Sequence, residues 1–262
     1  METQKMKTAV VILNWNGKHW LEKFLPNIIF NSSDATVIVV DNNSSDNSVS
    51  FLQEKFPNIQ IIQNDGNYGY AKGYNLAFKQ IDAEYFVLLN SDIEVTKDWI
   101  SPIVSLMDSD KTISACQPKI LDYNNKNKFE YAGGSGGYID KFGYPFCRGR
   151  IFDELEEDKG QYNDATEVFW ATGACLFVRS SQFLEIGGLD EDFFAHQEEI
   201  DLCWRLKNKG YKIMVEPKSE VYHVGGGTLN VGSPFKTHLN FRNNLYMLFK
   251  NLPLSSLFTI IP

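Results

Sequence analysis

Apolar and polar positions along the first 120 residues follow two alternating patterns. Short apolar runs rich in Val and Ile predict strands, and apolar residues at helical spacing between them predict amphipathic helices. The predicted strands cover residues 8–14, 36–40, 59–63 and 85–89. The predicted helices lie near residues 19–30, 49–56 and 73–79. Short strands that alternate with helices are typical of parallel βαβ units, so we expect an α/β fold.

The pattern changes in the rest of the chain. Residues 122–166 are rich in Gly, Asn and charge, which predicts loops or a hairpin insertion. The later predicted elements are a strand-like run over 167–180, a helix over 198–209, a strand after it, and a helix over 235–251. The sequence contains no internal repeat, so we expect one domain over residues 1–262.

Composition limits the class of protein. A chain of 262 residues with 43% hydrophobic content can bury a core, and its net charge of −8 argues against a nucleic-acid partner. The absence of a CxxC pair fits a reducing compartment better than disulfides or a zinc site. The cysteines are Cys116, Cys147, Cys175 and Cys203. Without a signal peptide or an apolar run of about 18 residues, we expect a cytoplasmic protein, although the apolar end LPLSSLFTIIP leaves open that the native chain continues.

Polar side chains stand where the predicted strands end. They are Asn14, Asp41, Asn64 with Asp65, and Asn90 with Asp92. Ligands of parallel sheets bind beyond the carboxyl ends of the strands, so this clustering indicates a site. A carboxylate there repels an anionic ligand unless a cation intervenes, and Mg²⁺ or Mn²⁺ suits one carboxylate plus phosphates. The alternatives are local: Asp92 as a turn residue, and Asp41 as a helix cap instead of a contact to a nucleobase or ribose.

Three further segments carry candidate chemistry. Glycines within residues 64–78 let the backbone approach a ligand closely, although no dinucleotide-binding GxGxxG follows the strand. Glu198, Glu199 and Asp201 crowd one helix start. Clustered acids raise one another's pKa, which suits a general base, but the helix dipole alone also favours acids there. His223 is either a metal ligand or a strand residue with a locally satisfied ring.

Taken in order, these motifs resemble glycosyltransferase family 2 on a GT-A fold, in particular its bacterial rhamnosyltransferase-like branch. The matching segments are VVILNWNG, VIVVDNNSSD, NDGNYGYAKGYN, VLLNSDIEV, WATGACLFVRS, GGLDEDFFAHQEEIDLCWR, VYHVGGGT and FRNN, which span residues 10–244. The resemblance implies a mostly parallel central sheet flanked by helices. It also implies a nucleotide-sugar-binding half over 1–121, an irregular insertion over 122–166, an acceptor and catalytic half over 167–234, and a C-terminal helical tail over 235–262.

The resemblance also implies residues for the donor and the metal ion. The donor-binding residues would be Asn14, Trp15, Asp41, Asn67, Gly69, Asn75, Asn90 and Ser91. Asp92 corresponds to the metal-binding acid of the family's DxD motif, in which Asn90 here replaces the first acid. His223 corresponds to a second protein ligand of the ion, which would be Mg²⁺ or Mn²⁺.

Acceptor and catalytic residues are implied in the same way. The residues facing the sugar and the acceptor would be Trp170, Gly173 and Ala174. Glu199 stands where the family usually has a catalytic Asp, Glu198 competes with it for the role of base, and Asp201 would support it. Arginines expected to reach the phosphates are Arg205 and Arg242.

The implied reaction is a single displacement with inversion. A sugar would move from dTDP-rhamnose or a UDP-sugar to a hydroxyl of a saccharide or lipid-linked acceptor in cell-surface polysaccharide synthesis. Peripheral contact with the inner face of the plasma membrane would accompany such an acceptor. One alternative is a non-catalytic module that binds a nucleotide sugar or a metal. The other is a sugar nucleotidyltransferase, which normally has a basic, glycine-rich phosphate loop near the N-terminus, whereas this chain has no Lys or Arg in ILNWNG.

Overall fold

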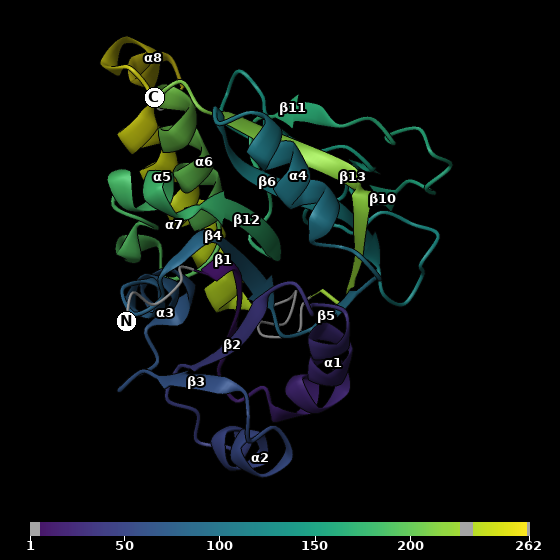
Figure 1. Cartoon of the computed structure of the whole chain (residues 1–262). Coiled ribbons are helices and arrows are strands. Elements are labelled where there is room, and N and C mark those ends of the chain that lie inside the picture. The colour runs from purple at the N-terminus through teal and green to yellow at the C-terminus, as the bar shows by residue number, and fades with distance from the viewer. Residues whose placement is uncertain (1–5, 226–232, 261–262) are drawn as a thin grey trace.

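A nine-stranded sheet forms the centre of the molecule (Figure 1). The computed structural model describes residues 6–225 and 233–260. The strand order is β11-β13-β6-β12-β4-β1-β2-β3, and β5 pairs with β13. Its strands are β1 (Met6–Asn14), β2 (Thr36–Asp41), β3 (Gln60–Gln63), β4 (Ala83–Asn90), β5 (Ile93–Val95), β6 (Ile113–Asp122), β11 (Thr166–Val168), β12 (Cys175–Arg179) and β13 (Lys212–His223).

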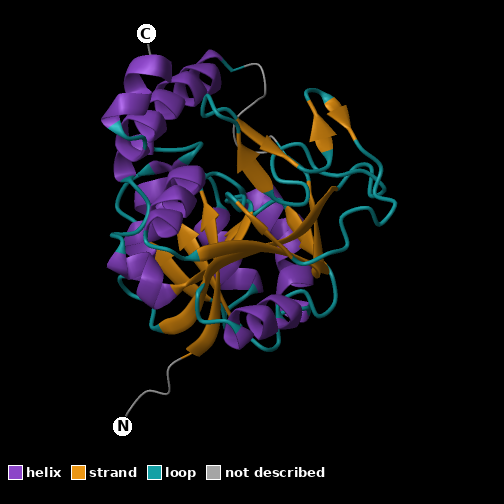
Figure 2. Cartoon of the chain, turned by 90° about the horizontal axis from the view of Figure 1, so that it is seen from above, coloured by secondary structure: helices purple, strands orange, loops and turns teal. Residues whose placement is uncertain are grey.

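Helices flank this sheet (Figure 2). Their buried side chains complete two hydrophobic cores. One core takes buried residues from α1 (Lys18–Phe30), α2 (Ser48–Lys55) and α4 (Ser101–Ser109). The other takes them from α3 (Gly69–Phe78), α5 (Ser180–Glu185), α6 (Glu198–Asn208) and α7 (Pro234–Asn251). Because apolar side chains point to both faces of the sheet, its central strands are apolar almost throughout. All four cysteines are buried and free.

The strands of the N-terminal half run parallel. β1 pairs with β2 and β4, and β2 pairs with β3. In this register Asn14 lies opposite Asp41, and Leu13 lies opposite Asn90. The four carboxyl ends therefore meet at one edge of the sheet, as the alternation of strands and helices predicted. The predicted strand bounds differ from the observed ones by at most two residues.

The other half of the sheet is mixed. β12 runs antiparallel to β4 and β6, while β13 runs parallel to β6 and antiparallel to β5 and β11. The twelve-residue β13 ends at His223, which lies opposite Ile93 of β5. The Val224 N–H then donates to the carbonyl of Asp92 at 3.1 Å. Strand pairing thus brings together two residues that are far apart in the sequence.

The predicted insertion, residues 122–166, runs from the end of β6 to the start of β11 and contains two small sheets outside the central one. β7 (Gly137–Ile139) pairs with β8 (Pro145–Cys147), and β9 (Arg150–Ile151) pairs with β10 (Glu154–Leu155). Two short helices complete the fold. The 3₁₀ helix η1 (Glu191–Phe193) precedes α6, and α8 (Leu254–Ile260) follows α7. Within the described residues, no helix has both the length and the apolar character to cross a membrane. The last part of the VYHVGGGT segment, from Gly226 on, lies outside the described residues.

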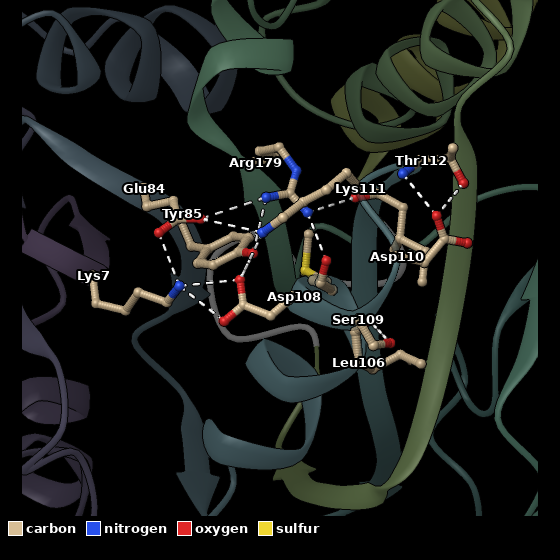
Figure 3. Close-up of polar contacts among 12 residues, drawn as sticks. Lys7, Glu84, Tyr85, Leu106, Asp108, Ser109, Asp110, Lys111, Thr112 and Arg179 are labelled. Carbon is tan, nitrogen blue, oxygen red and sulfur yellow. Dashed lines mark hydrogen bonds and ion pairs between the residues drawn. The ribbon is translucent and has the colours of Figure 1, made fainter.

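A polar network around Arg179 fastens the edge of the sheet opposite the strand carboxyl ends. Arg179 is 7% exposed and donates to the Tyr85 hydroxyl at 2.9 Å and to the Met107 carbonyl at 2.7 Å (Figure 3). Tyr85 donates to Asp108 at 2.8 Å, and Lys7 pairs with Asp108 at 2.8 Å. These contacts join β1, β4, β12 and α4, so they stabilise the scaffold at a distance from the other edge.

We expect Arg179→Leu to lower the free energy of unfolding by about 3 kcal/mol, because it leaves buried polar partners of a charged group unpaired. Lys111→Ala is the matched control, since Lys111 makes an exposed pair with Asp108 at 3.1 Å and should contribute at most about 1 kcal/mol. Urea denaturation followed by circular dichroism measures both losses. Equal losses for the two variants would contradict the structural role of Arg179.

Candidate active site

Asp92 and His223 lie side by side where β4 and β13 end. The distance from Asp92 Oδ1 to His223 Nε2 is 3.2 Å. Both side chains are buried, at 5% and 7% exposure. The amide Nδ2 of Asn90 lies 3.4 Å from the same ring nitrogen. The buried apolar run 85–89 therefore ends in a cluster of three polar side chains that share one point.

The contact between Asp92 and His223 outweighs the effect of their burial. Burial alone raises the pKa of Asp92, but the hydrogen bond and charge of His223 bring it below its usual value. Burial alone lowers the pKa of His223, but Asp92, followed by Glu130, raises it to about 10. At neutral pH the two side chains form a buried imidazolium–carboxylate pair. A cation bound to Nε2 would take the place of the proton there.

The donor atoms of this pair fit a divalent cation. Neighbouring ligands on an octahedral ion with bonds of about 2.1 Å lie about 3 Å apart, and the two atoms here are 3.2 Å apart. Among the residues that the structure describes, no three His, Cys, Asp or Glu side chains gather into a group that could hold a metal ion. Two protein ligands leave the remaining positions to water and phosphate oxygens, which is the arrangement that Mg²⁺ and Mn²⁺ favour.

The segment before β12 lies directly against the end of β4. The Asn90 N–H donates to the Ala174 carbonyl at 2.9 Å, and the Gly173 carbonyl accepts from the Tyr70 hydroxyl at 2.5 Å. A Cβ on Gly173 would lie 2.8 Å from that hydroxyl and 3.6 Å from Glu199 Cβ, so a glycine is needed for this close approach. Two of the predicted acceptor residues therefore lie between the end of β4 and the start of α6.

Trp170 has a different environment from its two predicted partners. It is 5% exposed, and its Nε1 donates to the Tyr138 carbonyl at 2.9 Å. A Cβ on Gly137 would come within 1.9 Å of the indole, so the ring packs directly on that glycine. The indole thus supports the β7–β8 sheet, and this packing does not favour the predicted contact with the sugar.

Two adjacent carboxylates open α6. Glu198 is 4% exposed and Glu199 is partly buried, and within the described part of the chain the Oε2 atom of each is buried without a hydrogen-bond partner. Burial raises the pKa of both groups, and the charge of Glu199 raises that of Glu198 further. A carboxylate with a raised pKa and a free oxygen is suited to accept a proton. Glu199 is the more accessible of the two and lies beside Gly173.

A strained segment precedes these carboxylates. Phe194, His196 and Gln197 have φ angles of 64°, 71° and 67°, which non-glycine residues rarely adopt. Asn243 of α7 holds the segment, because its amide donates to the carbonyls of Ala195 at 2.8 Å and His196 at 2.7 Å. Strain of about 1–3 kcal/mol per residue persists only where surrounding contacts impose it. Asn243 is thus a positioning residue for the start of α6.

Asp201 and the two predicted phosphate-binding arginines are engaged within the protein. The Asp201 carboxylate accepts from Arg205 at 2.7 Å, from Asn251 at 2.9 Å and from Lys250 at 3.0 Å. Arg205 and Arg242 also donate to backbone carbonyls. These contacts fasten α6 to α7 and to the loop before η1. They do not favour the predictions that Asp201 assists a base and that the arginines reach phosphates.

The ends of β1 and β2 are joined by side chains predicted to bind the donor. Asn14 donates to Asp41 at 3.1 Å and to the Ser44 hydroxyl at 3.2 Å. The other oxygen of Asp41 accepts from the Ser44 N–H at 2.8 Å. Asp41 thus makes a local turn contact, but it is not the helix cap that was the alternative to ligand binding, because the N-cap residue of α2 is Asn47. A contact from Asp41 to a base stays a prediction.

Trp15 and Ser91 flank Asn14 at the same edge. Trp15 is 43% exposed, so its indole is available to a ligand. A Cβ on Gly17 would lie 2.5 Å from Asn14 Oδ1 and 3.7 Å from Ser91 Oγ, which shows how closely these strand ends converge. Asn14 Oδ1 is buried and has no hydrogen-bond partner among the described residues. It is an acceptor that a ligand donor could satisfy.

Asn42 holds two of the predicted donor residues in the loop before α3. Its amide donates to the Gly69 carbonyl at 2.9 Å and to Asn67 Oδ1 at 3.3 Å. Gly69 has a φ of 70°, and a Cβ there would lie 2.5 Å from a backbone carbonyl oxygen. Asn75 is placed differently, since it donates to the Leu189 carbonyl at 2.7 Å and accepts from the Leu189 N–H at 3.0 Å. Its amide fastens another loop and is not free for the diphosphate.

Three residues of the site were not predicted from the sequence. Asn42 lies in the DNNSSD cluster and Asn243 in FRNN, so both stood within recognised segments but without a role. Glu130 lies 3.4 Å from His223 Nδ1 and is 4% exposed. It comes from the Gly- and Asn-rich insertion, where no local pattern marks a buried acid.

Comparison with known proteins identifies the family. The sequence profile described as "Glycosyl transferase family 2" matches residues 9–180, more than half of the chain. The chain belongs to glycosyltransferase family 2. This confirms the family that the motifs indicated and does not favour the nucleotidyltransferase alternative.

Relatives of this family-2 chain include hexosyltransferases and rhamnosyltransferases. The low-salt glycan biosynthesis hexosyltransferase Agl10 of Haloferax volcanii is 25% identical, covering 90% of this chain and 73% of its own. The N-acetylglucosaminyl-diphospho-decaprenol L-rhamnosyltransferase of Mycobacterium tuberculosis is 25% identical, covering 82% and 75%. Rhamnosyltransferase WbbL of Escherichia coli is 24% identical and covers 82% of each chain.

Solved glycosyltransferase structures share the fold. GalNAc-T7, solved with UDP, GalNAc and Mn²⁺, superposes with a TM-score of 0.72 at 16% identity, over 95% of this chain and 48% of that one. The mannosyltransferase PcManGT of Pyrobaculum calidifontis, solved with GDP-Man and Mn²⁺, gives 0.65 at 14% identity, over 98% and 68%. This chain thus spans about half the length of GalNAc-T7. The predicted GT-A fold is confirmed.

Glu198 should make stability fall as pH rises. Its pKa is raised above the ordinary 4.5 in the folded protein, so folding retains a proton that the unfolded chain releases above that pH. The contribution of this proton to the free energy of unfolding is complete below pH 4.5. It is lost as the pH rises toward the pKa of Glu198 in the folded protein, by up to about 1.4 kcal/mol per pH unit. We expect Glu198→Gln, which keeps the shape, to flatten this dependence.

Denaturant unfolding at several pH values from about 5 to 8 measures the slope, which follows from proton linkage. The exposed Glu154→Gln is the control and should keep the wild-type slope. If Glu198→Gln has the same slope as the wild type, Glu198 does not retain the proton.

Proposed function

We propose that this family-2 protein is an inverting glycosyltransferase that moves a sugar from a nucleoside-diphosphate sugar to a hydroxyl group of a saccharide or lipid-linked acceptor. One observation carries the proposal. A continuous set of contacts runs from the Asp92–His223 pair through Asn90, Ala174 and Gly173 to the start of α6. The candidate cation ligands and the candidate base therefore lie on two sides of the segment that contains Gly173 and Ala174, which supports the proposal.

Asp92 Oδ1 and His223 Nε2 are the atoms that would hold Mg²⁺ or Mn²⁺. When bound, the ion would neutralise the charge of the departing nucleoside diphosphate. Mn²⁺ in the solved GalNAc-T7 and PcManGT structures supports a divalent cation here. Asn90 lies close enough to contribute as well, because its amide can turn its oxygen toward the same point.

Glu199 would act as the base. It takes the proton from the acceptor hydroxyl while that oxygen forms a bond to the anomeric carbon. The bond from this carbon to the diphosphate oxygen breaks on the opposite side, so the configuration inverts. The raised pKa and free Oε2 of Glu199 support this role. Glu198 is buried more deeply, which favours Glu199 as the residue that meets the acceptor.

The relatives support a rhamnosyl or other hexosyl donor, and dTDP-rhamnose and UDP-sugars are the donors we propose. They also support a place in cell-surface polysaccharide synthesis. At the donor end, Asn14 Oδ1 and the exposed indole of Trp15 are available for a nucleoside. A non-catalytic role would leave the two unpaired buried carboxylate oxygens of Glu198 and Glu199 without an explanation.

We expect Glu199→Gln to lower kcat by about 10²- to 10⁴-fold while nucleotide and Mn²⁺ binding persist, because only the proton acceptor is removed. Glu198→Gln is the matched control and should retain most of the activity. Transfer from dTDP-rhamnose and UDP-sugars is followed by product chromatography, and nucleotide binding by thermal shift. Full activity in Glu199→Gln together with loss in Glu198→Gln would reverse the assignment. Full activity in both would exclude this base.

We also propose that the outer face of α7 and α8 meets the membrane that carries a lipid-linked acceptor, at the cytoplasmic side. Large apolar side chains there are between 51% and 83% exposed: Phe241, Leu245, Phe249, Leu254 and Phe258. The three on α7 recur every four residues and so share one face. Residues 234–260 contain Lys and Arg but no Asp or Glu, in a chain of net charge −8. Such a face suits an anionic lipid surface.

Replacing both Phe241 and Phe249 by Ser should weaken binding to vesicles of anionic phosphatidylglycerol by at least about tenfold, because burying each ring contributes about 2 kcal/mol. Phe152→Ser is the control, since Phe152 is 89% exposed but lies in the β9–β10 turn. Vesicle sedimentation measures the bound fraction. Unchanged binding of the double variant, or no binding of the wild type, would overturn this contact.

A further inference from the structure

We propose that Glu130 is a positioning residue for the cation site: it fixes the His223 ring so that Nε2 faces Asp92, and it keeps the proton on Nδ1 when a cation takes the place of the proton on Nε2. This inference rests on the proposed cation-binding role of Asp92 and His223. It adds a third side chain that touches neither the sugar donor nor the ion. Its contribution would be to select which nitrogen of His223 carries the proton.

The geometry places Glu130 on the far side of the ring from Asp92. Its Oε1 lies 3.4 Å from His223 Nδ1, whereas Asp92 Oδ1 lies 3.2 Å from Nε2. The three side chains are 4%, 7% and 5% exposed in the order Glu130, His223, Asp92. The imidazole is therefore held between two buried carboxylates, one at each nitrogen.

Glu130 is itself anchored, which allows it to orient a neighbour. Its Oε2 accepts from the Ala132 N–H at 2.7 Å, and its own N–H donates to the Ile120 carbonyl of β6 at 3.0 Å. The second contact ties the insertion to the strand that pairs with β13. Within residues 6–225 and 233–260, His223 is also the only ion-pair partner found for Glu130. Its charge is therefore directed at this ring.

Tautomer chemistry explains why the position matters. A neutral imidazole carries one N–H, and it can bind a cation through Nε2 only when the proton is on Nδ1. A carboxylate next to Nδ1 stabilises that tautomer and restrains rotation of the ring. Histidine ligands of metal ions commonly have such a partner, and its loss typically weakens metal binding by about 10- to 100-fold.

A glutamine at position 130 cannot replace the glutamate. One carboxylate oxygen accepts from the Ala132 N–H at 2.7 Å, and the other faces His223 Nδ1 at 3.4 Å as an ion pair. Among the described residues His223 Nδ1 has no closer hydrogen-bond partner, so this carboxylate oxygen is the acceptor available to it. An amide has one oxygen and one NH₂ group, so it can accept on one side only. Either the backbone contact or the Nδ1–H contact is lost, although size and shape are retained.

The test compares the Mn²⁺ affinity of the full-length wild type, Glu130→Gln and Glu216→Gln. Calorimetry and electron paramagnetic resonance of free Mn²⁺ measure this affinity, each with and without UDP or dTDP. Glu216 is the matched control, a buried acid of β13 at 6% exposure whose carboxylate accepts from the Lys218 N–H at 2.9 Å. We expect Glu130→Gln to weaken Mn²⁺ binding by about 10- to 100-fold, and Glu216→Gln to leave it unchanged. The melting temperature of each variant without metal shows whether it is folded.

Asp92→Asn separates this inference from the proposed function. If Asp92→Asn loses Mn²⁺ binding but folded Glu130→Gln binds like the wild type, the role of Glu130 is wrong and the cation site stands. Wild-type protein that binds no Mn²⁺ in the presence of either nucleotide overturns both. A parallel loss in Glu216→Gln would show that any buried acid of this region affects the site through stability, and would also overturn the inference. Should Glu130→Gln not fold, Glu130→Ala and Glu130→Asp are measured by the same criteria.

Discussion

The pairing of β13 with β5 and β6 is the constraint on which the site depends. β13 has no local reason to end beside β4, because β6 and β12 lie between the two strands in the sheet and the whole insertion lies between them in the sequence. Hydrogen bonding in register with Ile93 sets His223 next to Asp92. A shift by one residue would turn the imidazole to the opposite face. The Asp92–His223 pair is thus a product of strand register and not of sequence proximity.

The carboxylates of the candidate site have pKa values that their surroundings shift in opposite directions. Asp92 is buried but faces His223, so its pKa is lowered and it stays charged. Glu198 and Glu199 are buried without such a partner, so their pKa values are raised. An ionised carboxylate is suited to hold a cation, while one with a raised pKa is suited to accept a proton. All three carboxylates are at least partly buried, so the presence or absence of a cationic partner such as His223 decides the direction of the pKa shift.

Strain and its restraint are concentrated between η1 and α6. Phe194, His196 and Gln197 adopt positive φ angles immediately before the candidate base. Asn243 and Asp201 fix this segment and α6 against α7, which explains why Asp201, predicted to support the base, is found in structural contacts. Precise placement of a base requires rigid support, and polar residues near an active site often provide it.

The sequence by itself determined the local elements: apolar runs, cap residues and helical spacing located the parallel strands, their polar ends and the acidic start of α6. Asp92, His223 and Glu199 were also singled out, through the motifs in which they stand and the family that those motifs resemble. Only the tertiary structure decided the partners of these residues. Glu130 meets His223, Asp201 meets α7, and Asn75 meets Leu189 across long stretches of chain. A pattern along the sequence reports the periodicity within one helix or strand. These contacts form only when separate elements pack together, so the spacing of residues within an element does not predict them.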